Sequence, residues 1–359
     1  MLDVLRHLKQ EPKHFHSADH VPAKDRARMF GLNTIDNNSW LIGDRAVLTR
    51  RHGASWPADT PGLISTWTAT DDGACYAISN APVPPPPSRP WRPEEDPPKL
   101  VHLAAGGPPV SGLPDAHVAD VMAKCVYYVG GVFIKMHHAL HCDSTDEHIT
   151  INTLRKQLPD RTFELPNVLY HAKYDNRYFL VTSGVAGQPA ESIWWELDDS
   201  TKDYYAELVA QSCCEIATLT SSELATGVDG SMVEERDSRL RQGLTRKDQP
   251  DMMANCRALG LDVEPPFFCL YHGDQGPTNV LIDREKRKIG VVDWQAAEFV
   301  PRDWIGINFA RAMAMLHNPP LPEGYSANDY ANRVWIALQR RGFRNDGEAW
   351  RVWKEVDCE

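Results

Sequence analysis

Two polar side chains in the last third of the chain have the types and spacing of a divalent-metal site. Short apolar, β-branched runs at Val280–Ile282 and Ile289–Val292 flank the charged segment Asp283–Lys288 and predict an antiparallel hairpin. Asn279 precedes the first run and Asp293 follows the second, so the hairpin would bring the two side chains together. Amide and carboxylate oxygens are ligands that Mg²⁺ prefers in proteins. The sequence therefore predicts a magnesium site at the open end of this hairpin.

A further carboxylate lies on the loop that leads into the hairpin, in the spacing His272-x-Asp274-x4-Asn279. Kinase phosphoryl transfer uses one Asp to accept the proton of the substrate hydroxyl, an Asn to hold one magnesium ion and a later Asp to hold metal at the phosphates. Asp274 is thus the candidate base, and Asn279 and Asp293 are the candidate metal ligands. A surface hairpin with polar loop ends is the less favoured interpretation, because HGDxxxxN followed by a hairpin ending in VDW is a rarer combination than a lone DxxxxN.

The stretch Tyr271–Ile305 resembles the aminoglycoside phosphotransferase and choline-kinase-like families, and in particular fungal proteins of the phosphotransferase enzyme family. The shared motifs are the HGD-x4-N loop, the VDW motif and the segment EFVPRDWI at Glu298–Ile305. The similarity runs from around Val118 to the C-terminus. It implies an α+β, bilobal, protein-kinase-like fold with a small β-rich N-terminal lobe and a larger, mostly helical C-terminal lobe. It also implies ATP and Mg²⁺ as cofactors and a small-molecule hydroxyl as acceptor.

A lysine upstream fits the same scheme. The apolar runs Cys125–Val129 and Val132–Lys135 predict a two-stranded ladder that ends on this lysine. A kinase needs a strand lysine to pair with ATP phosphates, and the resemblance favours that role for Lys135 over a lysine that snorkels from a strand end. The resemblance also implies a helix glutamate that pairs with this lysine. Glu147 is the first choice, and alignment on Leu165–Val168 would shift the position by one turn.

Other parts of the nucleotide site are implied by the resemblance. No G-x-G-x-x-G occurs, so the phosphate-covering loop is either Gly106–Gly112 or the turn Gly130–Gly131. The apolar run Tyr178–Thr182 predicts a strand, and the hinge that contacts adenine would follow it at Ser183 and Val185. His272, within the catalytic motif, is expected to support the loop by hydrogen bonding without acting as the base.

Two helices are predicted in the C-terminal half. Ser200–Leu219 has apolar residues at helical spacing, and Ser200-x-x-Asp203 resembles a capping box. Asp303 is placed to cap a second helix, Trp304–Leu316. The polar stretch 220–266 would shape the acceptor pocket, and an amine-bearing sugar, a choline-like alcohol and a fungal secondary metabolite all stay open as acceptors.

Composition limits the class of protein. The chain has 359 residues, of which 42% are hydrophobic, enough for one bilobal unit or two domains. A net charge of −11 without a dense Lys/Arg cluster argues against nucleic-acid binding. No apolar run is long enough to span a membrane and the start has no secretory pattern, while eight cysteines without a CxxC pair indicate reduced thiols. We therefore expect a cytoplasmic enzyme with a small-molecule substrate and no nucleic-acid or membrane partner.

Residues 1–98 lie outside the resemblance and are expected to precede an N-terminal lobe at 99–182 and a C-terminal lobe at 183–359. Ser39–Arg50 and Leu63–Ser79 predict two hairpins, and the proline-rich segment Val83–Lys99 predicts an extended linker. The first hairpin faintly echoes the strands before Lys135, with Thr49 at the lysine position. Two unrelated hairpins are favoured over a degenerate duplicate, because short strand patterns recur by chance.

An isolated hairpin is marginal in water, so these hairpins need a surface to pack on. We expect them to dock on the N-terminal lobe around Val126–Ile134, where they would extend its sheet or cover the nucleotide cleft. The alternative is an independent module tethered by the linker.

A rival function belongs to another class. A kinase-like fold can bind a nucleotide or metabolite without phosphorylating it, or serve another reaction such as cyclisation or dehydration. The missing glycine motif leaves room for this, but a scaffold has no need of Asp274, Asn279 and Asp293 together. A protein-serine kinase is disfavoured because no APE-like segment follows VDW.

Overall fold

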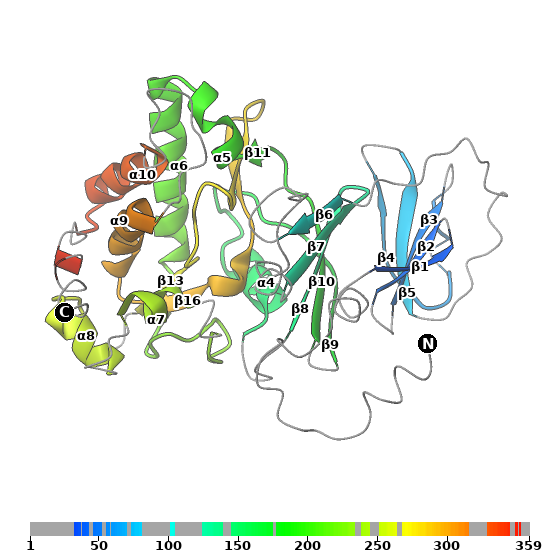
Figure 1. Ribbon diagram of the computed structural model, residues 1–359, viewed down its shortest axis with the longest axis horizontal. Coiled ribbons are helices and arrows are strands. Elements are labelled where there is room, and N and C mark those ends of the chain that lie inside the picture. The colour runs from blue at the N-terminus through cyan, green and yellow to red at the C-terminus, as the bar shows by residue number, and fades with distance from the viewer. Residues whose placement is uncertain are drawn as a thin grey trace, which may run out of the picture. The chain divides into compact units, whose positions relative to one another are not determined.

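The computed structural model describes most of the chain between residues 32 and 352. The described ranges are 32–36, 38–42, 46–51, 55–57, 59–69, 73–80, 101–104, 124–138, 145–174, 177–233, 238–244, 251–263, 268–315, 329–344, 349–350 and 352. The proline-rich segment and the Gly106–Gly112 loop lie outside them. The chain divides into two compact units, Met1–Ala139 with Leu169–Thr182, and Leu140–Val168 with Ser183–Glu359 (Figure 1).

The first unit contains two five-stranded sheets. Sheet A consists of β1 (Leu32–Asp36), β2 (Ser39–Ile42), β3 (Ala46–Arg51), β4 (Leu63–Thr68) and β5 (Cys75–Asn80), in the order β1-β2-β3-β5-β4. Sheet B consists of β6 (Val101–Ala104), β7 (Lys124–Val129), β8 (Val132–His138), β9 (Val168–Tyr174) and β10 (Arg177–Ser183), in the order β6-β7-β8-β10-β9. The hairpins predicted at β2–β3, β4–β5 and β7–β8 are therefore confirmed.

The two sheets share one apolar core. Trp40, Leu48 and Ile78 of sheet A belong to the same buried cluster as Ile134 and Phe179 of sheet B. The N-terminal hairpins thus dock on the small lobe, as expected. They neither extend its sheet nor cover the face of Lys135: they form a separate sheet, and the alternation along β8 directs Lys135 away from the shared core.

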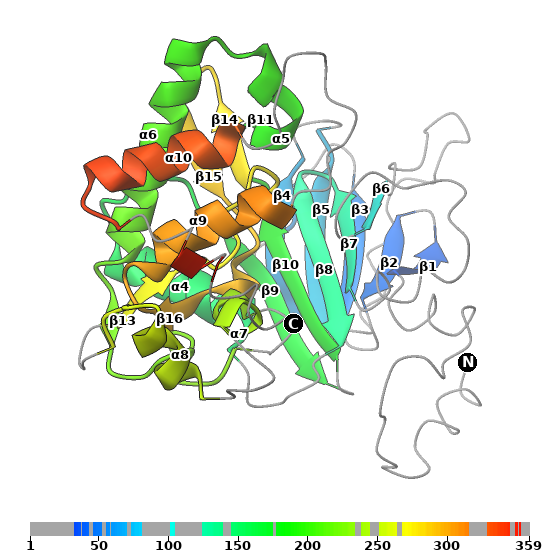
Figure 2. The same cartoon turned by 60° about the vertical axis from the view of Figure 1, so that its left-hand side comes forward.

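The second unit holds the helices. They are α4 (Glu147–Gln157), α5 (Ala190–Ile193), η2 (Trp194–Glu196), α6 (Asp199–Ile216), α7 (Arg239–Leu244), α8 (Met252–Ala258), η3 (Trp294–Ala296), α9 (Trp304–Met315) and α10 (Asp329–Arg340). In Figure 2, α10 (red) lies beside both α6 (green) and α9 (orange). Together with the β-rich first unit, this gives the α+β organisation that the sequence predicts.

Two small sheets complete the second unit. One contains β11 (Gln188–Pro189), β14 (Val280–Asp283) and β15 (Lys288–Val291), and the other contains β12 (Thr220–Ser221), β13 (Phe268–Tyr271) and β16 (Glu298–Val300). The segment that carries the HGD motif starts at the end of β13, and the VDW motif lies between β15 and β16. The strands of the predicted hairpin contribute Val280, Ile282, Ile289 and Val291 to the apolar core of this unit.

The start of α6 differs from the prediction. Asp198 is the N-cap, since its carboxylate accepts a hydrogen bond from the backbone N–H of Thr201 at 2.8 Å. Ser200, the predicted cap, donates its hydroxyl to Asp198 at 2.6 Å. These hydrogen bonds lower the pKa of Asp198, the bond from Ser200 having the largest effect.

Two general properties of the described residues bear on the protein class. Cys75, Cys213, Cys214, Cys256 and Cys269 are free thiols, and burial raises the pKa of Cys256 and of Cys269 to about 12. None of the helices in the described ranges is long and apolar enough to cross a membrane.

Candidate active site

The hairpin β14–β15 brings the two candidate metal ligands together. Its strands pair antiparallel with Val280 opposite Val291, and the backbone N–H of Val292 donates to the carbonyl of Asn279 at 3.0 Å. Because Val292 directly precedes Asp293, this bond fixes Asn279 beside that carboxylate. The predicted juxtaposition is therefore present in the backbone.

The amide of Asn279 has a defined orientation. Its Nδ2 donates to the backbone carbonyl of Asp274 at 2.8 Å. Only the nitrogen of an amide can donate to a carbonyl, so Oδ1 is directed elsewhere. One side chain thus anchors the loop of Asp274 and keeps its oxygen available as a cation ligand.

Asp293 has a backbone conformation that few residue types adopt. Its φ and ψ are 65° and 61°, in the left-handed region, and it directly precedes η3. Asp and Asn are the non-glycine residues that tolerate this region best, and such conformations concentrate at functional sites. The bend turns the chain sharply at the end of β15, where the half-buried carboxylate stands.

Glu147 contacts this bend from a distant part of the sequence. It is 3% exposed at the start of α4, and its Oε1 accepts a hydrogen bond from the backbone N–H of Trp294 at 3.2 Å. Trp294 packs between Phe163 and His272, with ring centroids 6.1 and 4.5 Å away. The helix glutamate therefore holds the residue that follows Asp293. Its pairing with Lys135, which lies on β8 of the first unit, stays a prediction.

His272 is fully buried and ties the catalytic loop to the hairpin. The backbone N–H of Asp274 donates to its Nδ1 at 3.2 Å, so the ring proton lies on Nε2, which donates to the carbonyl of Val292 at 2.9 Å. Both ring nitrogens are thereby occupied. This arrangement supports the loop that carries Asp274, whose side chain is half-buried.

The middle position of the HGD motif requires glycine for steric reasons. Gly273 has a φ of 81°, and an added Cβ would overlap the backbone carbonyl of Ala296. The loop of Asp274 therefore lies against the chain that follows Asp293. A larger residue at this position would push the two segments apart.

Two buried amides that the sequence analysis missed, Asn308 and Gln275, hold the loop of Asp274 in place through hydrogen bonds. Asn308 on α9 is buried, and its Nδ2 donates to the carbonyl of Gly273 at 2.9 Å and to the hydroxyl of Tyr271 at 3.1 Å. Gln275 is buried as well and donates to Ser212 on α6 at 2.6 Å. Asn308 had a signal, as an amide inside the otherwise apolar run WIGINF. Gln275 had none.

The segment EFVPRDWI also has a supporting role. Glu298 is completely buried, and its carboxylate accepts hydrogen bonds from the hydroxyl of Ser238 at 2.6 Å and from the N–H of Leu240 at 2.8 Å. It thus caps the first turn of α7. Asp303 faces Arg344, with a carboxylate-to-guanidinium distance of 3.7 Å.

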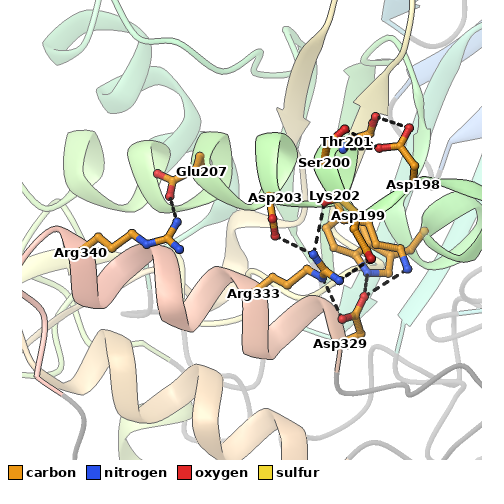
Figure 3. Close-up of polar contacts among 11 residues, drawn as sticks. Asp198, Asp199, Ser200, Thr201, Lys202, Asp203, Glu207, Asp329, Arg333 and Arg340 are labelled. Atoms are coloured by element: carbon orange, nitrogen blue, oxygen red, sulfur yellow. Dashed lines mark hydrogen bonds and ion pairs between the residues drawn. The ribbon is translucent and has the colours of Figure 1, made fainter.

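A charged network joins α6 to α10 (Figure 3). Asp329 accepts from Trp194 Nε1 at 2.9 Å and pairs with Lys202 at 3.3 Å and with Arg333 at 2.8 Å. Burial acts to raise the pKa of Asp329, but the hydrogen bonds from Arg333 and Trp194 outweigh it and hold this pKa below its usual value. Its neighbour Tyr330 donates to the carbonyl of Gln275 at 3.3 Å, which links the network to the loop.

Of the two predicted hinge residues, Val185 lies beside the β14–β15 hairpin, and Ser183 is bonded to Asn167. The N–H of Ser183 donates to the carbonyl of Asn167 at 2.9 Å, and its hydroxyl accepts from the N–H of Asn167 at 2.9 Å. The side chain of Val185 packs so closely on Gly290 of β15 that a Cβ there would overlap it. The following strand β11 pairs with β14. The adenine contacts of Ser183 and Val185 stay a prediction.

Comparisons with known proteins identify the family. The model of the phosphotransferase enzyme family matches residues 126–339, more than half of the chain. Similar solved structures include the streptomycin–ATP complex of APH(2'')-IIa (13% identity, 71% of this chain and 81% of that chain, TM-score 0.41) and ADP-bound APH(2'')-Ib (14%, 70% and 81%, 0.39). They also include the ADP and hygromycin B complex of a thermostable mutant of APH(4)-Ia (16%, 70% and 90%, 0.38). No curated protein matches the sequence. On the family match and the loop–hairpin geometry, the chain belongs to the phosphotransferase enzyme family.

Proposed function

We propose that this phosphotransferase moves the γ-phosphoryl group of ATP to a hydroxyl of a small metabolite, with Mg²⁺ as cofactor. The observation that carries the proposal is a pair of hydrogen bonds at one hairpin: the Asn279 amide donates to the Asp274 backbone at 2.8 Å, and the N–H of Val292, next to Asp293, donates to the carbonyl of Asn279 at 3.0 Å. A proton acceptor beside an amide–carboxylate ligand pair is the arrangement that phosphoryl transfer needs.

The donors at the hairpin fit magnesium. Asn279 offers an amide oxygen and Asp293 a carboxylate, both hard ligands. Among the described residues no group of three or more His, Cys, Asp or Glu side chains could hold a metal by itself. Magnesium in kinases is bound by one or two protein side chains together with water and substrate phosphates, so two ligands suffice. When bound, Mg²⁺ neutralises charge on the phosphates of the nucleotide.

The chain's own residues would divide the remaining work. Asp274 orients the acceptor hydroxyl and takes its proton as the oxygen bonds to the γ-phosphorus, while the bond to the bridging oxygen breaks and ADP leaves. Lys135 pairs with the α and β phosphates, and Glu147 pairs with Lys135. Ser183 and Val185 contact adenine. His272 keeps Asp274 in place through its bond to the loop backbone.

The acceptor is proposed only as a class, a hydroxylated small molecule. ATP consumption should be screened against pooled aminoglycosides, choline-like alcohols and hydroxylated secondary metabolites, each with and without Mg²⁺. We expect at least one pool to consume ATP in a Mg²⁺-dependent way. Turnover of a metabolite in nucleotide-free, EDTA-treated buffer would instead support cyclisation or dehydration chemistry and overturn the kinase assignment.

A further inference from the structure

Sheet A repeats the strand order of sheet B. The orders β1-β2-β3-β5-β4 and β6-β7-β8-β10-β9 are the same when each sheet is numbered from its own first strand. The family match begins at residue 126, so sheet A lies outside it. Two unrelated hairpins would not be expected to produce the same five-stranded order, with the fourth strand outside the fifth in both sheets.

The central hairpins can be aligned from the pair nearest each turn, although three residues connect Ile42 to Ala46 and two connect Val129 to Val132. The pairs Ile42↔Ala46, Trp40↔Leu48 and Ser39↔Thr49 in sheet A match Val129↔Val132, Tyr127↔Ile134 and Val126↔Lys135 in sheet B. Thr49, which is 5% exposed, therefore occupies the position of Lys135. In sheet B, the connection between β8 and β9 contains α4 with Glu147. In sheet A, the described residues of the corresponding connection, between β3 and β4, contain no helix. Sheet A thus repeats the scaffold without the lysine and without the glutamate.

The contact between the sheets is made on the strand that carries Lys135. Val132, Ile134 and Met136 alternate along β8 and are all buried in the cluster shared with sheet A. Side chains alternate between the two faces of a strand, so Lys135 projects from the face opposite sheet A. Sheet A therefore packs on Ile134 and Met136, the residues on either side of the lysine, while the lysine side chain lies on the opposite face of the strand.

The turn before β8 is clamped by two aromatic rings. Trp67 Nε1 on β4 donates to the carbonyl of Gly130 at 2.8 Å. Trp67 stacks on Tyr76, with ring centroids 5.5 Å apart, and Tyr76 lies so close to Gly130 that a Cβ there would overlap its ring. Gly130 has a φ of 56°, so glycine is needed for conformation as well as for space. This contact ties the Gly130 end of the turn to sheet A.

We propose that residues 32–80 are a degenerate second copy of the nucleotide-lobe sheet, which has lost its own nucleotide chemistry and positions β8 and Lys135 of the working copy. The proposal rests on the proposed function for the role of Lys135. Trp67 and Gly130 are then positioning residues that act through the β7–β8 turn. The chain should bind one nucleotide per molecule.

The test is Trp67→Phe, which keeps an aromatic ring on Tyr76 and removes the indole donor. The matched control is Trp195→Phe, which removes an indole bond to the carbonyl of Ser192 (2.9 Å) at a 41% exposed position in the second unit. For Trp67→Phe we expect faster hydrogen exchange of the β7–β8 amides and a Mg-ATP dissociation constant raised about three- to tenfold, the range for one net hydrogen bond. The KM for the acceptor and all values of the control should stay at wild-type levels.

Gly130→Ala is a second test variant that leaves the sequence of sheet A unchanged. Its added Cβ would overlap the ring of Tyr76, and alanine is strained at the positive φ of this position. It should raise exchange in the same amides and weaken Mg-ATP binding. Unchanged exchange and unchanged nucleotide affinity in both variants would overturn the positioning role, and two nucleotides per chain would overturn the loss of chemistry in sheet A. A wild-type protein that binds no Mg-ATP would refute the proposed function, and the exchange comparison would still decide whether sheet A holds β8.

Discussion

The side chain of Asn279 donates to the backbone carbonyl of Asp274 at 2.8 Å, so the candidate metal ligand and the candidate base are held by one hydrogen bond. The backbone of Asn279 is in turn bonded to Val292, next to Asp293. A shift of any one of these residues would therefore be felt by the other two. This coupling lets a short hairpin keep the three groups of the proposed site in register.

Asp293→Asn should weaken Mg-ATP binding without unfolding the protein. Asn also tolerates the left-handed conformation of position 293, so the bend is kept while the carboxylate charge is lost. Loss of one such electrostatic group typically costs about 10²–10³ in rate. Calorimetry of Mg-ATP binding and the melting temperature check this, with exposed Asp160→Asn as control. Unchanged Mg-ATP affinity in the variant would show that Asp293 is not a metal ligand.

Asp274→Asn separates chemistry from nucleotide binding. The amide keeps the shape of the side chain and cannot accept the proton of the acceptor hydroxyl, so phosphoryl transfer should fall by roughly 10²–10⁴. Mg-ATP affinity should persist, because the ligands Asn279 and Asp293 are intact. Rapid-quench measurement of a single turnover, combined with calorimetry, distinguishes the two effects. A variant with wild-type transfer would remove Asp274 from the mechanism.

Local patterns predicted the hairpin and its flanking polar groups, because both the strand pairing and the positions of Asn279 and Asp293 depend on residues within a short stretch. The contact of Glu147 with Trp294 joins residues 147 positions apart, and a sequence pattern holds no information on that distance. The cap of α6 was misplaced for a different reason. Asp198 and Ser200 are both good caps, and only the backbone decides which carboxylate or hydroxyl reaches the N–H of Thr201.

The N-terminal sheet shows the same division. The two hairpins follow from alternation and turn residues, and their need for a partner surface follows from their apolar content. The choice between extending sheet B and stacking on it depends on the shape of the Trp67–Tyr76 platform against Gly130. That fit involves residues of both sheets, so the local pattern of either segment does not show it.

Asn308→Asp should lower kcat with little change in the KM for ATP. The substitution keeps the size of the side chain but removes both N–H donors that reach Gly273 and Tyr271. The buried carbonyl of Gly273 then loses its partner, at a cost of about 1–3 kcal/mol in the free energy of unfolding. Tyr271→Phe removes only the bond to Tyr271 and is the matched control. If both variants lost stability alike and kept wild-type kcat, Asn308 would have no part in positioning the loop.

Asp329→Asn should destabilise the second unit more than Asp203→Asn, although both carboxylates pair with Arg333. Asp329 also pairs with Lys202, whose side chain is only 8% exposed, so its loss removes negative charge from beside a buried ammonium group. We expect a loss of about 2–3 kcal/mol in the free energy of unfolding for Asp329→Asn. The exposed Asp203 pair should contribute less than about 1 kcal/mol.

The difference between wild type and Asp329→Asn should also depend on pH. The pKa of Asp329 is lowered in the folded state, so its carboxylate takes up a proton more readily when the chain is unfolded. Its contribution to stability is therefore fully present above the pKa of an unfolded Asp, about 3.9, and is lost as the pH falls through the lower folded value. Melting temperatures of wild type and variant at pH 6, 4.5 and 3 should converge at the acidic end, because titration of the other carboxylates is common to both proteins. A gap that stayed constant down to pH 3 would show that the charge of Asp329 does not hold α6 and α10 together.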